Sequence, residues 1–587
     1  MAADSERPRG PRDFSVQRDL FPLPRLEEAA GWHGPRAGRR RLVQRIDRRA
    51  RFTEEVNETI DALNWCSGVS DFAGESVALA QQVAVDHIVK VHRESARCPR
   101  DITTQAAREE LLGGPSDYGG SSSLVVTYDE QKVSIPQAGA SPTPLASVLP
   151  DSDCECLERF GEKMLIGPDE WGTITQNERD VHIKPFMDKR LAGDVGLYEQ
   201  FVQRLRDCGL VRFGVRSRTM VTPFFVRKKN DRQRLVIDCR PANRCFKVPP
   251  PVFLGTSSEW GGLRVGPEDT LYAAQGDIKD YFYACGIQPG LSEYFCLPPV
   301  SGNFLLNAGL CYVDDVPVDP QGSYFPQLSV MPMGWSWAFY FAQQVHKHLI
   351  QKYSNIGPND FLEMGSPPPD LEASRCGVHA YCDNLTVFGT KPTDVQQLTD
   401  SIITGIESEG FTVHEKVEAT DYVITVGVEL DGLKGEVACK TERKWRLVKV
   451  MRWLGSRPLV SGKHLERAIG HATFVLMLRR PLLAVFRAVY HFIQNQPYHT
   501  PTRLSAEAAR ECRAAAALIP FASASLRRPV ATTVSAFDAC PTGMGVGESL
   551  WEEADVLNVT KFDDRWRFKL DKFDKVPARI NSHLSLG

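Results

Sequence analysis

The chain has 587 residues, a length that allows roughly three or four domains of ordinary size. Hydrophobic residues make up 42% and charged residues 24% of the sequence, as in globular proteins that bury a large core. The formal net charge of −3 argues, by itself, against a nucleic-acid partner.

The overall charge hides two strongly basic segments. There are 13 Lys and Arg residues against three acids from Arg204 to Lys247, and 12 against two from Lys440 to Tyr490. A solvated charged face usually mixes both signs, so this one-sided composition favours a polyanion as partner.

The cysteine spacing and the apolar segments indicate where in the cell the protein is expected. None of the 15 cysteines forms a Cys-x-x-Cys pair, so we expect a reduced intracellular protein, with nucleus or cytoplasm left open. The best apolar stretch, 474–492, is interrupted by Arg479-Arg480-Pro481, and the first 20 residues are too charged for a signal peptide. We therefore expect a soluble protein with no membrane-spanning helix.

The first 185 residues carry few strong patterns. Residues 1–52 are rich in Arg, Pro and Gly and contain no lysine, which predicts a flexible basic arm. Residues 53–98 show two helical patterns of unknown role. In residues 99–185, glycine, serine and proline interrupt any period, so we expect a linker with short structured pieces.

A helix and a hairpin follow. Leu197, Phe201 and Leu205 recur at helical spacing and predict an amphipathic helix that ends at Gly209. The segment Phe224 to Asp238 predicts two strands joined by a polar turn, a basic hairpin whose Lys and Arg side chains could hold a triphosphate. As an isolated motif it is more often an exposed hairpin.

Three further segments come in order along the chain. Asp277 ends a short strand and precedes aromatic residues, so we expect its carboxylate in a cleft. Val330 to Ala338 contains a glycine turn that opens a helix over 339–350. Gly377 to Gly389 has two apolar arms around Asp383-Asn384, which predicts a β-hairpin with polar residues at its tip. Alone, this hairpin would be an ordinary surface turn.

In this order, the four motifs resemble those of the reverse transcriptase domain of retroelements, over about 195 to 495. The variants Met331-Pro-Met-Gly-Trp335 and Tyr381-Cys-Asp-Asn384 look closest to tyrosine-recombinase-type retroelements. The resemblance implies an α+β right-hand polymerase with palm, fingers and helical thumb. Its implied activity is that of an RNA-directed DNA polymerase, with an RNA or DNA template, a primer strand and deoxynucleoside triphosphates as partners.

The resemblance also implies a centre with two metal ions. Nucleotidyl transfer uses two Mg²⁺ ions about 4 Å apart, with Mn²⁺ as a possible substitute, and Mg²⁺ prefers hard oxygen ligands. Asp277 and Asp383 match the two indispensable carboxylates of the family, and the backbone carbonyl of Ile278 is the additional expected ligand.

A second set of residues would contact the incoming nucleotide by the same resemblance. They are Lys228, Lys229, Arg234, Asp280, Tyr281, Phe282, Met333 and Gly334. The choice between the two lysines stays open because the turn is one residue shorter than in retroviral enzymes. Phe282 stands where the family places an aromatic steric gate against a ribose 2′-hydroxyl, and core packing is its alternative. Many relatives have a small residue in place of Tyr281.

Two candidate catalytic residues have a second interpretation. Most reverse transcriptases carry an aspartate where Asn384 stands, and an amide gives metal ions less electrostatic support than a charge. Lys416 resembles a lysine proposed to protonate the leaving pyrophosphate, and a solvated strand-end lysine explains it equally well. A further Tyr-x-Asp-Asp sequence, Tyr312 to Asp315, precedes the glycine turn and is followed by prolines, so we expect a loop there.

The segments after the palm resemble two other parts of such proteins. One helical pattern runs from Leu447 to Leu454, and another from Leu465 to Leu476, which Ser461 should begin. With their basic excess they resemble a thumb that holds duplex backbone, and a structural helical bundle is the alternative.

Thr533 to Gly545 resembles the opening of retroelement ribonuclease H domains, in which Asp538 would be the first metal ligand. Leu584 stands where such a domain should supply a glutamate, and the chain stops at Gly587. We therefore expect an incomplete ribonuclease H-like α/β segment without nuclease activity.

The expected organisation has seven parts. They are a basic arm (1–52), a helical segment (53–98), a linker-like region (99–185), fingers and palm (186–435), a thumb (436–500), a connection (501–529) and a partial ribonuclease H-like segment (530–587). Template-directed DNA synthesis is the predicted function. The alternative is a decayed retroelement product that binds nucleic acid without catalysis, and Phe282 argues against a third interpretation, an RNA-directed RNA polymerase.

Overall fold

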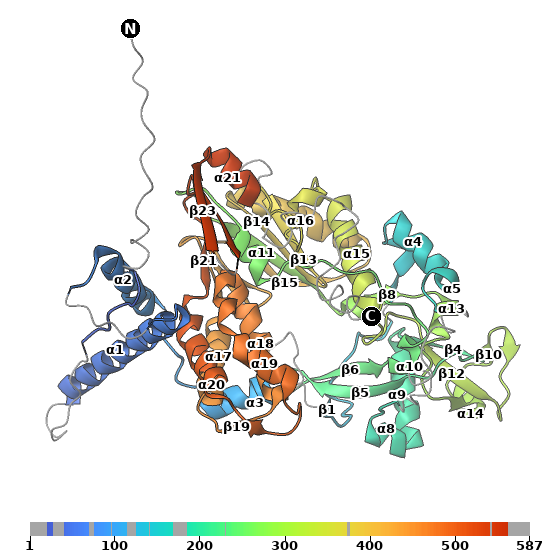
Figure 1. Cartoon of the computed structure of the whole chain (residues 1–587). Helices are drawn as coiled ribbons and strands as arrows, with labels where there is room; N and C mark the ends of the chain where they lie inside the picture. The colour runs from blue at the N-terminus through green and yellow to red at the C-terminus, as the bar shows by residue number, and fades with distance from the viewer. Residues whose placement is uncertain are drawn as a thin grey trace, which may run out of the picture. The chain divides into compact units, whose positions relative to one another are not determined.

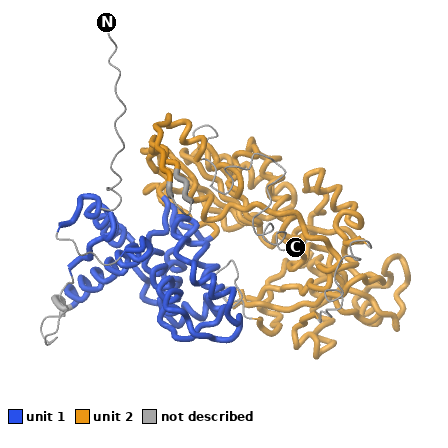
Figure 2. Tube along the Cα trace, in the orientation of Figure 1, with its two compact units in different colours: residues 1–122, 427–429, 437–524 blue, residues 123–426, 430–436, 525–587 orange. Residues whose placement is uncertain are grey.

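The computed structural model describes residues 20–27, 40–69, 76–95, 97–113, 125–139, 141–167, 185–228, 231–371, 376–540 and 543–560. Lys229 and Leu584 lie outside the described residues. The chain mixes helices and strands and divides into two compact units (Figure 2). Unit 1 comprises residues 1–122, 427–429 and 437–524, and unit 2 comprises residues 123–426, 430–436 and 525–587.

Unit 1 is helical and joins two parts of the chain that are far apart in sequence. Its longer helices are α1 (Arg40–Cys66), α2 (Leu79–Glu94), α3 (Thr104–Leu112), α17 (Thr441–Leu454), α18 (Gly462–Leu476), α19 (Arg487–Asn495) and α20 (Ala506–Leu518). Within the unit, α1 packs on α20 and α3 packs on α17, as Figure 1 shows for the blue and orange helices. The helices expected at 447–454 and 465–476 are confirmed, and the Ser461 hydroxyl caps α18 by accepting from the backbone N–H of His464.

The N-terminal residues of unit 1 are more ordered than the sequence indicates. Helix α1 begins at Arg40, and Leu23 is buried against Val56 and Ile60 of that helix. The side chain of Asn64 accepts from the backbone N–H of Leu23 at 2.6 Å and donates to its carbonyl at 3.0 Å. The flexible basic arm expected over 1–52 therefore does not extend to 20–27 or 40–52, because apolar residues between the arginines pack on the helix.

The central sheet of unit 2 has the strand order β13-β14-β7-β15. These strands are β13 (Cys376–Tyr381), β14 (Asn384–Gly389), β7 (Tyr272–Ile278) and β15 (Val413–Thr420), and all neighbouring pairs are antiparallel. Helices α15 (Ala338–Lys352) and α16 (Pro392–Ser408) pack on the sheet. Strands β13 and β14 are apolar and almost entirely buried, with Val378 and Val387 fully buried, whereas β15 is polar and mostly exposed. The hairpin expected over 377–389 and the helix over 339–350 are confirmed.

A second sheet of unit 2 has the order β1-β5-β6-β2. Its hairpin, β5 (Thr222–Arg227) and β6 (Gln233–Asp238), confirms the strands expected over 224–238, and α9 (Val195–Asp207) confirms the amphipathic helix before them. The outer strands are β1 (Val125–Val126) and β2 (Val133–Ser134). Both belong to the expected linker 99–185, which contributes to the core of unit 2 through residues such as Tyr128 and Leu145 and is no simple connection.

Shorter elements complete unit 2. They include α4 (Asp151–Glu158), α5 (Phe160–Lys163), α8 (Lys189–Gly193), β4 (Val211–Gly214), α10 (Arg240–Asn243), α11 (Ser257–Gly262), α12 (Tyr281–Ala284), β8 (Cys285–Gly286), α13 (Pro289–Ser292), β9 (Val300–Ser301), α14 (Gly302–Asn307) and β12 (Ser323–Leu328). The short strands β16 (Tyr422–Thr425), β17 (Val428–Asp431), β18 (Glu436–Cys439) and β21 (Ser523–Ser525) are divided between the two units and are not part of unit 2 alone.

The sequence Tyr312 to Asp315 forms a small hairpin, although a loop was expected. Strands β10 (Tyr312–Val313) and β11 (Val316–Pro317) pair in antiparallel fashion around Asp314 and Asp315. Both aspartates have positive φ, 49° and 62°, as the mirror-image two-residue hairpin turns require. Pro317 is tolerated because an isolated two-stranded ribbon leaves its outer edge free of hydrogen bonds.

The segment that resembles a ribonuclease H opening is a hairpin of β22 (Thr533–Cys540) and β23 (Gly543–Leu550), followed by α21 (Glu553–Thr560). The backbone of Asp538 pairs with Gly545, but its side chain lies outside the described residues. Residues 561–587 also lie outside them, so the ribonuclease H-like expectation stays a prediction.

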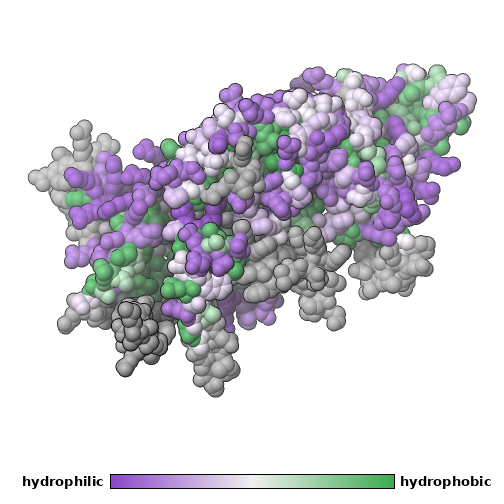
Figure 3. Space-filling model, turned by 90° about the horizontal axis from the view of Figure 1, so that it is seen from above, coloured by the Kyte–Doolittle hydropathy of each residue, from purple (hydrophilic) through white to green (hydrophobic). Residues whose placement is uncertain are grey.

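One helical stretch among the described residues, Gly462–Val485, is long and apolar enough to cross a membrane by length and composition alone. This stretch differs from 474–492, the one considered in the sequence, and the expectation of no membrane-spanning helix stays a prediction. The buried core helix of a soluble protein passes the same test, and Leu465, Ala472 and Leu476 of this stretch are fully buried in unit 1. Seen from above, hydrophilic side chains predominate on the described surface (Figure 3).

Candidate active site

The two aspartates predicted as metal ligands lie side by side at one end of the central sheet. Asp277 is the penultimate residue of β7, and Asp383 lies in the two-residue turn between β13 and β14. The register of β14 on β7 pairs Asn384 with Asp277, and the backbone N–H of Ile278 donates to the carbonyl of Asp383 at 2.9 Å. Residues 106 positions apart in the sequence thus meet because β7 is the direct neighbour of the hairpin.

The carboxylates of Asp277 and Asp383 are partly buried and lie close together, and both pKa values are raised. Burial, and then the neighbouring charge of Asp383, raise the pKa of Asp277 to about 6. Burial also raises the pKa of Asp383, although the Arg234 guanidinium and the Asn384 amide act in the opposite direction. Burial and the two neighbouring carboxylates outweigh the nearby Arg234, so an added cation would be attracted to the pair.

A histidine that the sequence interpretation missed completes the cluster. The register of β15 on β7 pairs His414 with Asp277, and Nε2 of His414 lies 2.8 Å from Oδ1 of Asp277. His414 is two residues before Lys416, whose ammonium instead forms an ion pair with Glu407 of α16 at 2.8 Å. The only sequence signal for His414 was its place two residues before Lys416, which the resemblance had already marked.

Asn384 acts on its neighbour. Its side-chain amide donates to Oδ1 of Asp383 at 3.0 Å, and this contact lowers the pKa of Asp383. An amide that donates to a carboxylate holds that carboxylate in place and favours its ionised form. Asn384 is thus placed to orient Asp383.

Two side chains of helix α15 hydrogen-bond to the backbone at the turn between β13 and β14. The Gln343 side chain donates to the carbonyl of Ala380 at 2.9 Å and accepts from the N–H of Cys382 at 2.8 Å. Nδ1 of the buried His346 donates to the carbonyl of Cys382 at 2.6 Å. Cys382 has a left-handed φ of 54°, a conformation that a non-glycine residue keeps only where its surroundings hold it. The spacing of Gln343 and His346 on one helix face was the available sequence signal.

The basic hairpin supplies cations near the aspartates. Arg234 on β6 is exposed and close enough to lower the pKa of Asp383. Lys228 follows β5, is exposed, and its backbone N–H donates to the carbonyl of Arg232 at 2.6 Å. Of the two lysines expected at the triphosphate, the structure thus describes Lys228.

The residues predicted to form the nucleotide pocket differ in backbone conformation and in side-chain burial. Asp280 has a left-handed φ of 51° and directly precedes the short helix α12. Tyr281 is fully buried and its hydroxyl donates to the carbonyl of Ala342 at 2.8 Å, so its side chain belongs to the core and not to an open pocket. Phe282 is only partly buried and packs at the edge of the core.

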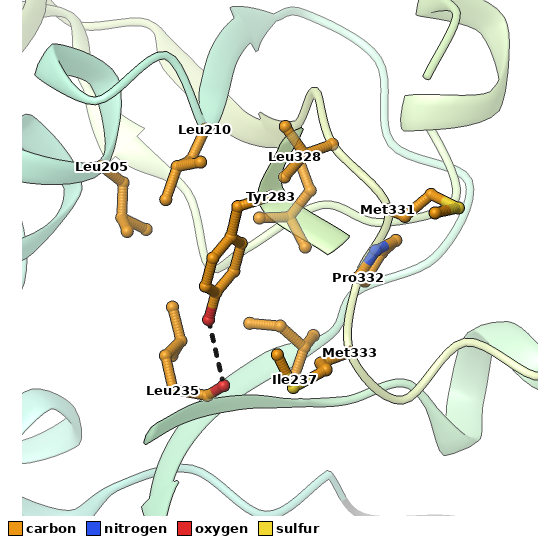
Figure 4. Close-up of a pocket in the computed structure, with 10 residues that line it drawn as sticks. Leu205, Leu210, Leu235, Ile237, Tyr283, Leu328, Met331, Pro332 and Met333 are labelled. Atoms are coloured by element: carbon orange, nitrogen blue, oxygen red, sulfur yellow. Dashed lines mark hydrogen bonds between the residues drawn. The ribbon is translucent and has the colours of Figure 1, made fainter. Parts of the chain in front are cut away.

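The glycine turn before α15 packs on the basic hairpin. The backbone N–H of Ile237 donates to the carbonyl of Met333, and a Cβ at Gly334 would lie 2.4 Å from the carbonyl oxygen of Ile237. Figure 4 shows Met333 beside Ile237 and Leu235, with the Tyr283 hydroxyl donating to the carbonyl of Leu235. Glycine is required at 334 by this close approach and by its φ of 127°.

The described side chains fit a hard divalent cation of the Mg²⁺ kind. No group of three or more His, Cys, Asp or Glu side chains in the described part of the chain could hold a metal ion by itself. Mg²⁺, however, is commonly bound by one or two carboxylates and completes its coordination with water and substrate phosphates. Burial and then the repulsion from Asp383 raise the pKa of Asp277, and a bound cation would offset both because it stabilises the ionised carboxylates.

No family model and no curated protein matches the chain. The solved structures similar to it include two with 12% sequence identity and a TM-score of 0.41 each. One is a foamy viral protease-reverse transcriptase dRH in complex with double-stranded DNA, and the similarity covers 78% of this chain and 67% of that chain. The other is a foamy viral protease-reverse transcriptase in complex with double-stranded DNA, with 84% and 87% covered. At this identity and TM-score the likeness decides nothing about activity.

Proposed function

We propose that the chain is an RNA-directed DNA polymerase that extends a primer on a template by two-metal nucleotidyl transfer. The observation that carries the proposal is the juxtaposition of Asp277 and Asp383, which the pairing of β7 with β14 brings to one end of the sheet. The motifs Met331 to Trp335 and Tyr381 to Asn384 favour a retroelement as the source of the chain.

Asp277, Asp383 and the carbonyl of Ile278 would hold the Mg²⁺ ions. When bound, the ions would lower the pKa of the primer 3′-hydroxyl and stabilise charge on the transferred phosphate. The protein's own part is to hold the two carboxylates in fixed positions. Asn384, His414 and the Gln343 and His346 contacts from α15 support that role.

The nucleotide would lie between the aspartates and the basic hairpin. Arg234 can bind phosphate oxygens with two N–H groups, and Lys228 can approach them as a point charge. Phe282, partly exposed at the edge of the core, would lie beside the sugar and exclude a 2′-hydroxyl. The Met333-Gly334 turn would contact the template–nucleotide pair.

Primer extension tests the proposal. The full chain is incubated with a DNA primer on an RNA template, deoxynucleoside triphosphates and Mg²⁺, beside Asp383→Asn and Asp400→Asn, which removes an exposed carboxylate on α16. We expect extension by the wild type and by Asp400→Asn, and none by Asp383→Asn. Equal extension by all three proteins would contradict the assignment of the site.

The alternative function is nucleic-acid binding without catalysis. The amide of Asn384, in place of a second carboxylate, is the observation that favours it, because the site then has less charge to hold two cations. Tight binding of the primer–template without extension in either Mg²⁺ or Mn²⁺ would establish this alternative and exclude the polymerase.

A further inference from the structure

A polar groove lies on the basic hairpin of unit 2, apart from the carboxylate pair. Its volume is about 380 Å³, enough for several phosphate groups in a row. The groove is lined by Val126, Thr127, Tyr128, Asp129, Lys132, Arg190, Arg227, Asp231, Arg232 and Gln233. We call it the hairpin groove.

The charge of the hairpin groove is positive, since four cations line it against two acids. Lys132 is paired with Asp231 at 2.5 Å and lies 4.0 Å from Asp129, so both acids are directed to one lysine. Arg190 donates to the carbonyl of Tyr128 at 2.9 Å, a bond that leaves its charge uncompensated.

The two remaining arginines carry the surplus charge. Arg227 and Arg232 are exposed, and neither forms an ion pair within 4.0 Å among the contacts of the described residues. Nε of Arg232 donates weakly to the Ser134 hydroxyl at 3.5 Å. The guanidinium groups are thus available for an anionic ligand, which each can bind with two parallel N–H groups.

The floor of the groove is held rigidly. The buried amide of Gln233 donates to the carbonyl of Thr127 at 2.8 Å and accepts from the N–H of Asp129 at 3.0 Å. The buried carboxylate of Asp188 accepts from the N–H of Tyr128 at 3.0 Å. These bonds fix the segment 127–129 against the hairpin, so an incoming ligand meets donors that are already ordered.

Arg227 and Gln233 of the hairpin groove lie on the opposite face of the hairpin from Arg234, whereas Arg232 precedes β6 at the turn. Arg227 and Gln233 are directly paired across β5 and β6 and share a face, whereas Arg234 is the next residue of β6 and projects to the other face. Arg234 is the residue close to Asp383. A strand bound in the groove would therefore leave the Arg234 face free for a nucleotide.

We propose that the hairpin groove binds the phosphate backbone of a single nucleic-acid strand. The aromatic residue among its described lining residues, Tyr128, is buried, so these residues offer no surface on which a base could stack. Contacts of Arg and Lys with phosphates alone give binding that is independent of sequence and falls with salt. Identifying the strand as template rests on the proposed function, but strand binding itself does not require catalysis.

The test is the salt dependence of strand binding. A fluorescent single-stranded RNA of mixed sequence is titrated with the full chain at several salt concentrations, in comparison with Arg227→Gln/Arg232→Gln. The double variant should bind about tenfold more weakly at low salt, and its slope of log K against log salt should fall by about 0.7 per lost contact. The control Arg216→Gln/Lys391→Gln removes the same charge from exposed positions outside the groove and should bind as the wild type does.

The outcomes separate this proposal from the proposed function. Equal binding and equal slope for the double variant and the control would overturn the hairpin groove as a strand site. A double variant that loses affinity for a nucleoside triphosphate but not for the strand would also overturn it. Weaker strand binding by the double variant supports the groove even if no protein extends a primer, a result that would contradict only the polymerase.

Discussion

Nε2 of His414 lies 2.8 Å from Oδ1 of Asp277, across the pair of neighbouring strands β15 and β7. This contact and the Asn384 amide on Asp383 give each carboxylate of the pair its own polar neighbour. Residues that hold metal-binding carboxylates commonly affect metal affinity or activity by 10- to 100-fold when they are replaced.

We therefore expect His414→Ala to raise the Mg²⁺ concentration for half-maximal primer extension by about tenfold, because Asp277 loses the group that orients it. A Mg²⁺ titration of the extension rate measures this. His414→Gln keeps a side-chain donor and should lie between wild type and His414→Ala, while His87→Ala, at an exposed position, should have no effect. An unchanged Mg²⁺ requirement in His414→Ala would contradict the positioning role.

Asn384→Asp should have the opposite effect on metal binding. The substitution replaces an amide donor with a charge beside Asp383, which increases the attraction for cations. We expect the half-maximal Mg²⁺ concentration to fall several-fold, measured by the same titration. A higher Mg²⁺ requirement would show that the donation from Asn384 to Asp383 matters more than added charge.

Phe282→Ala tests sugar selection. Removing the partly exposed ring should let ribonucleotides enter and reduce the preference for deoxynucleotides by about tenfold or more, since a missing steric contact no longer excludes the 2′-hydroxyl. The ratio of kcat/KM for the two sugars is the measurement. Phe304→Ala on α14 removes another partly buried ring and should leave the ratio unchanged. Unchanged selectivity in Phe282→Ala would assign the ring to core packing.

The stability of unit 2 should fall in acid because of its buried imidazoles. Burial lowers the pKa of His379 and of His346 from 6.5 to about 4, so between these values the unfolded chain binds a proton that the folded chain does not. Stability from each group is present above pH 6.5 and is lost as the pH falls toward 4. The loss from pH 8 to pH 5 should be about 2 kcal/mol for each imidazole.

Urea unfolding at pH 8 and pH 5 measures this loss. In His379→Gln the pH-dependent loss should be smaller by about 2 kcal/mol, whatever the variant's stability at pH 8. The same pH dependence in variant and wild type would mean that His379 is not the group responsible.

Ile60→Ala should destabilise unit 1 by about 2 to 5 kcal/mol, because Ile60 is fully buried between the N-terminal helices and the rest of the unit. Urea or thermal unfolding of the full chain measures it. Glu54→Ala, at an exposed position of the same helix, should change stability by less than about 0.5 kcal/mol. A neutral Ile60→Ala would show that the N-terminal helices contribute little to unit 1.

Local patterns predicted the elements whose side chains alternate or recur over many residues. The hairpin β5–β6 and the helices α9, α17 and α18 have such patterns because one face of each is more buried than the other, and β13–β14 is visible as two apolar arms around a polar turn. The two-residue strands β1 and β2 could not be predicted, since a period of two needs more residues than they contain. The sequence predicted a loop at Asp314-Asp315 because Pro317 would interrupt the hydrogen bonds of a larger sheet. Strands β10 and β11 form a separate two-stranded sheet, in which this proline is tolerated.

Some residues of the candidate site could also be predicted from the sequence, and others could not. Asp277 and Asp383 were predictable from motifs, because a carboxylate at a strand end or a turn is visible in the residues beside it. The proximity of Glu407 to Lys416, the burial of Tyr281 and the contact of His414 with Asp277 depend on which strands are neighbours and which helix lies behind them. Likewise, only folding brings α1 against α20 and α3 against α17. The sequence by itself determined most helices and strands and the two candidate carboxylates, since these depend on local periodicity and residue type. The tertiary structure decided which residues contact them, because hydrogen bonds and burial between distant segments exist only once the strands and helices have packed.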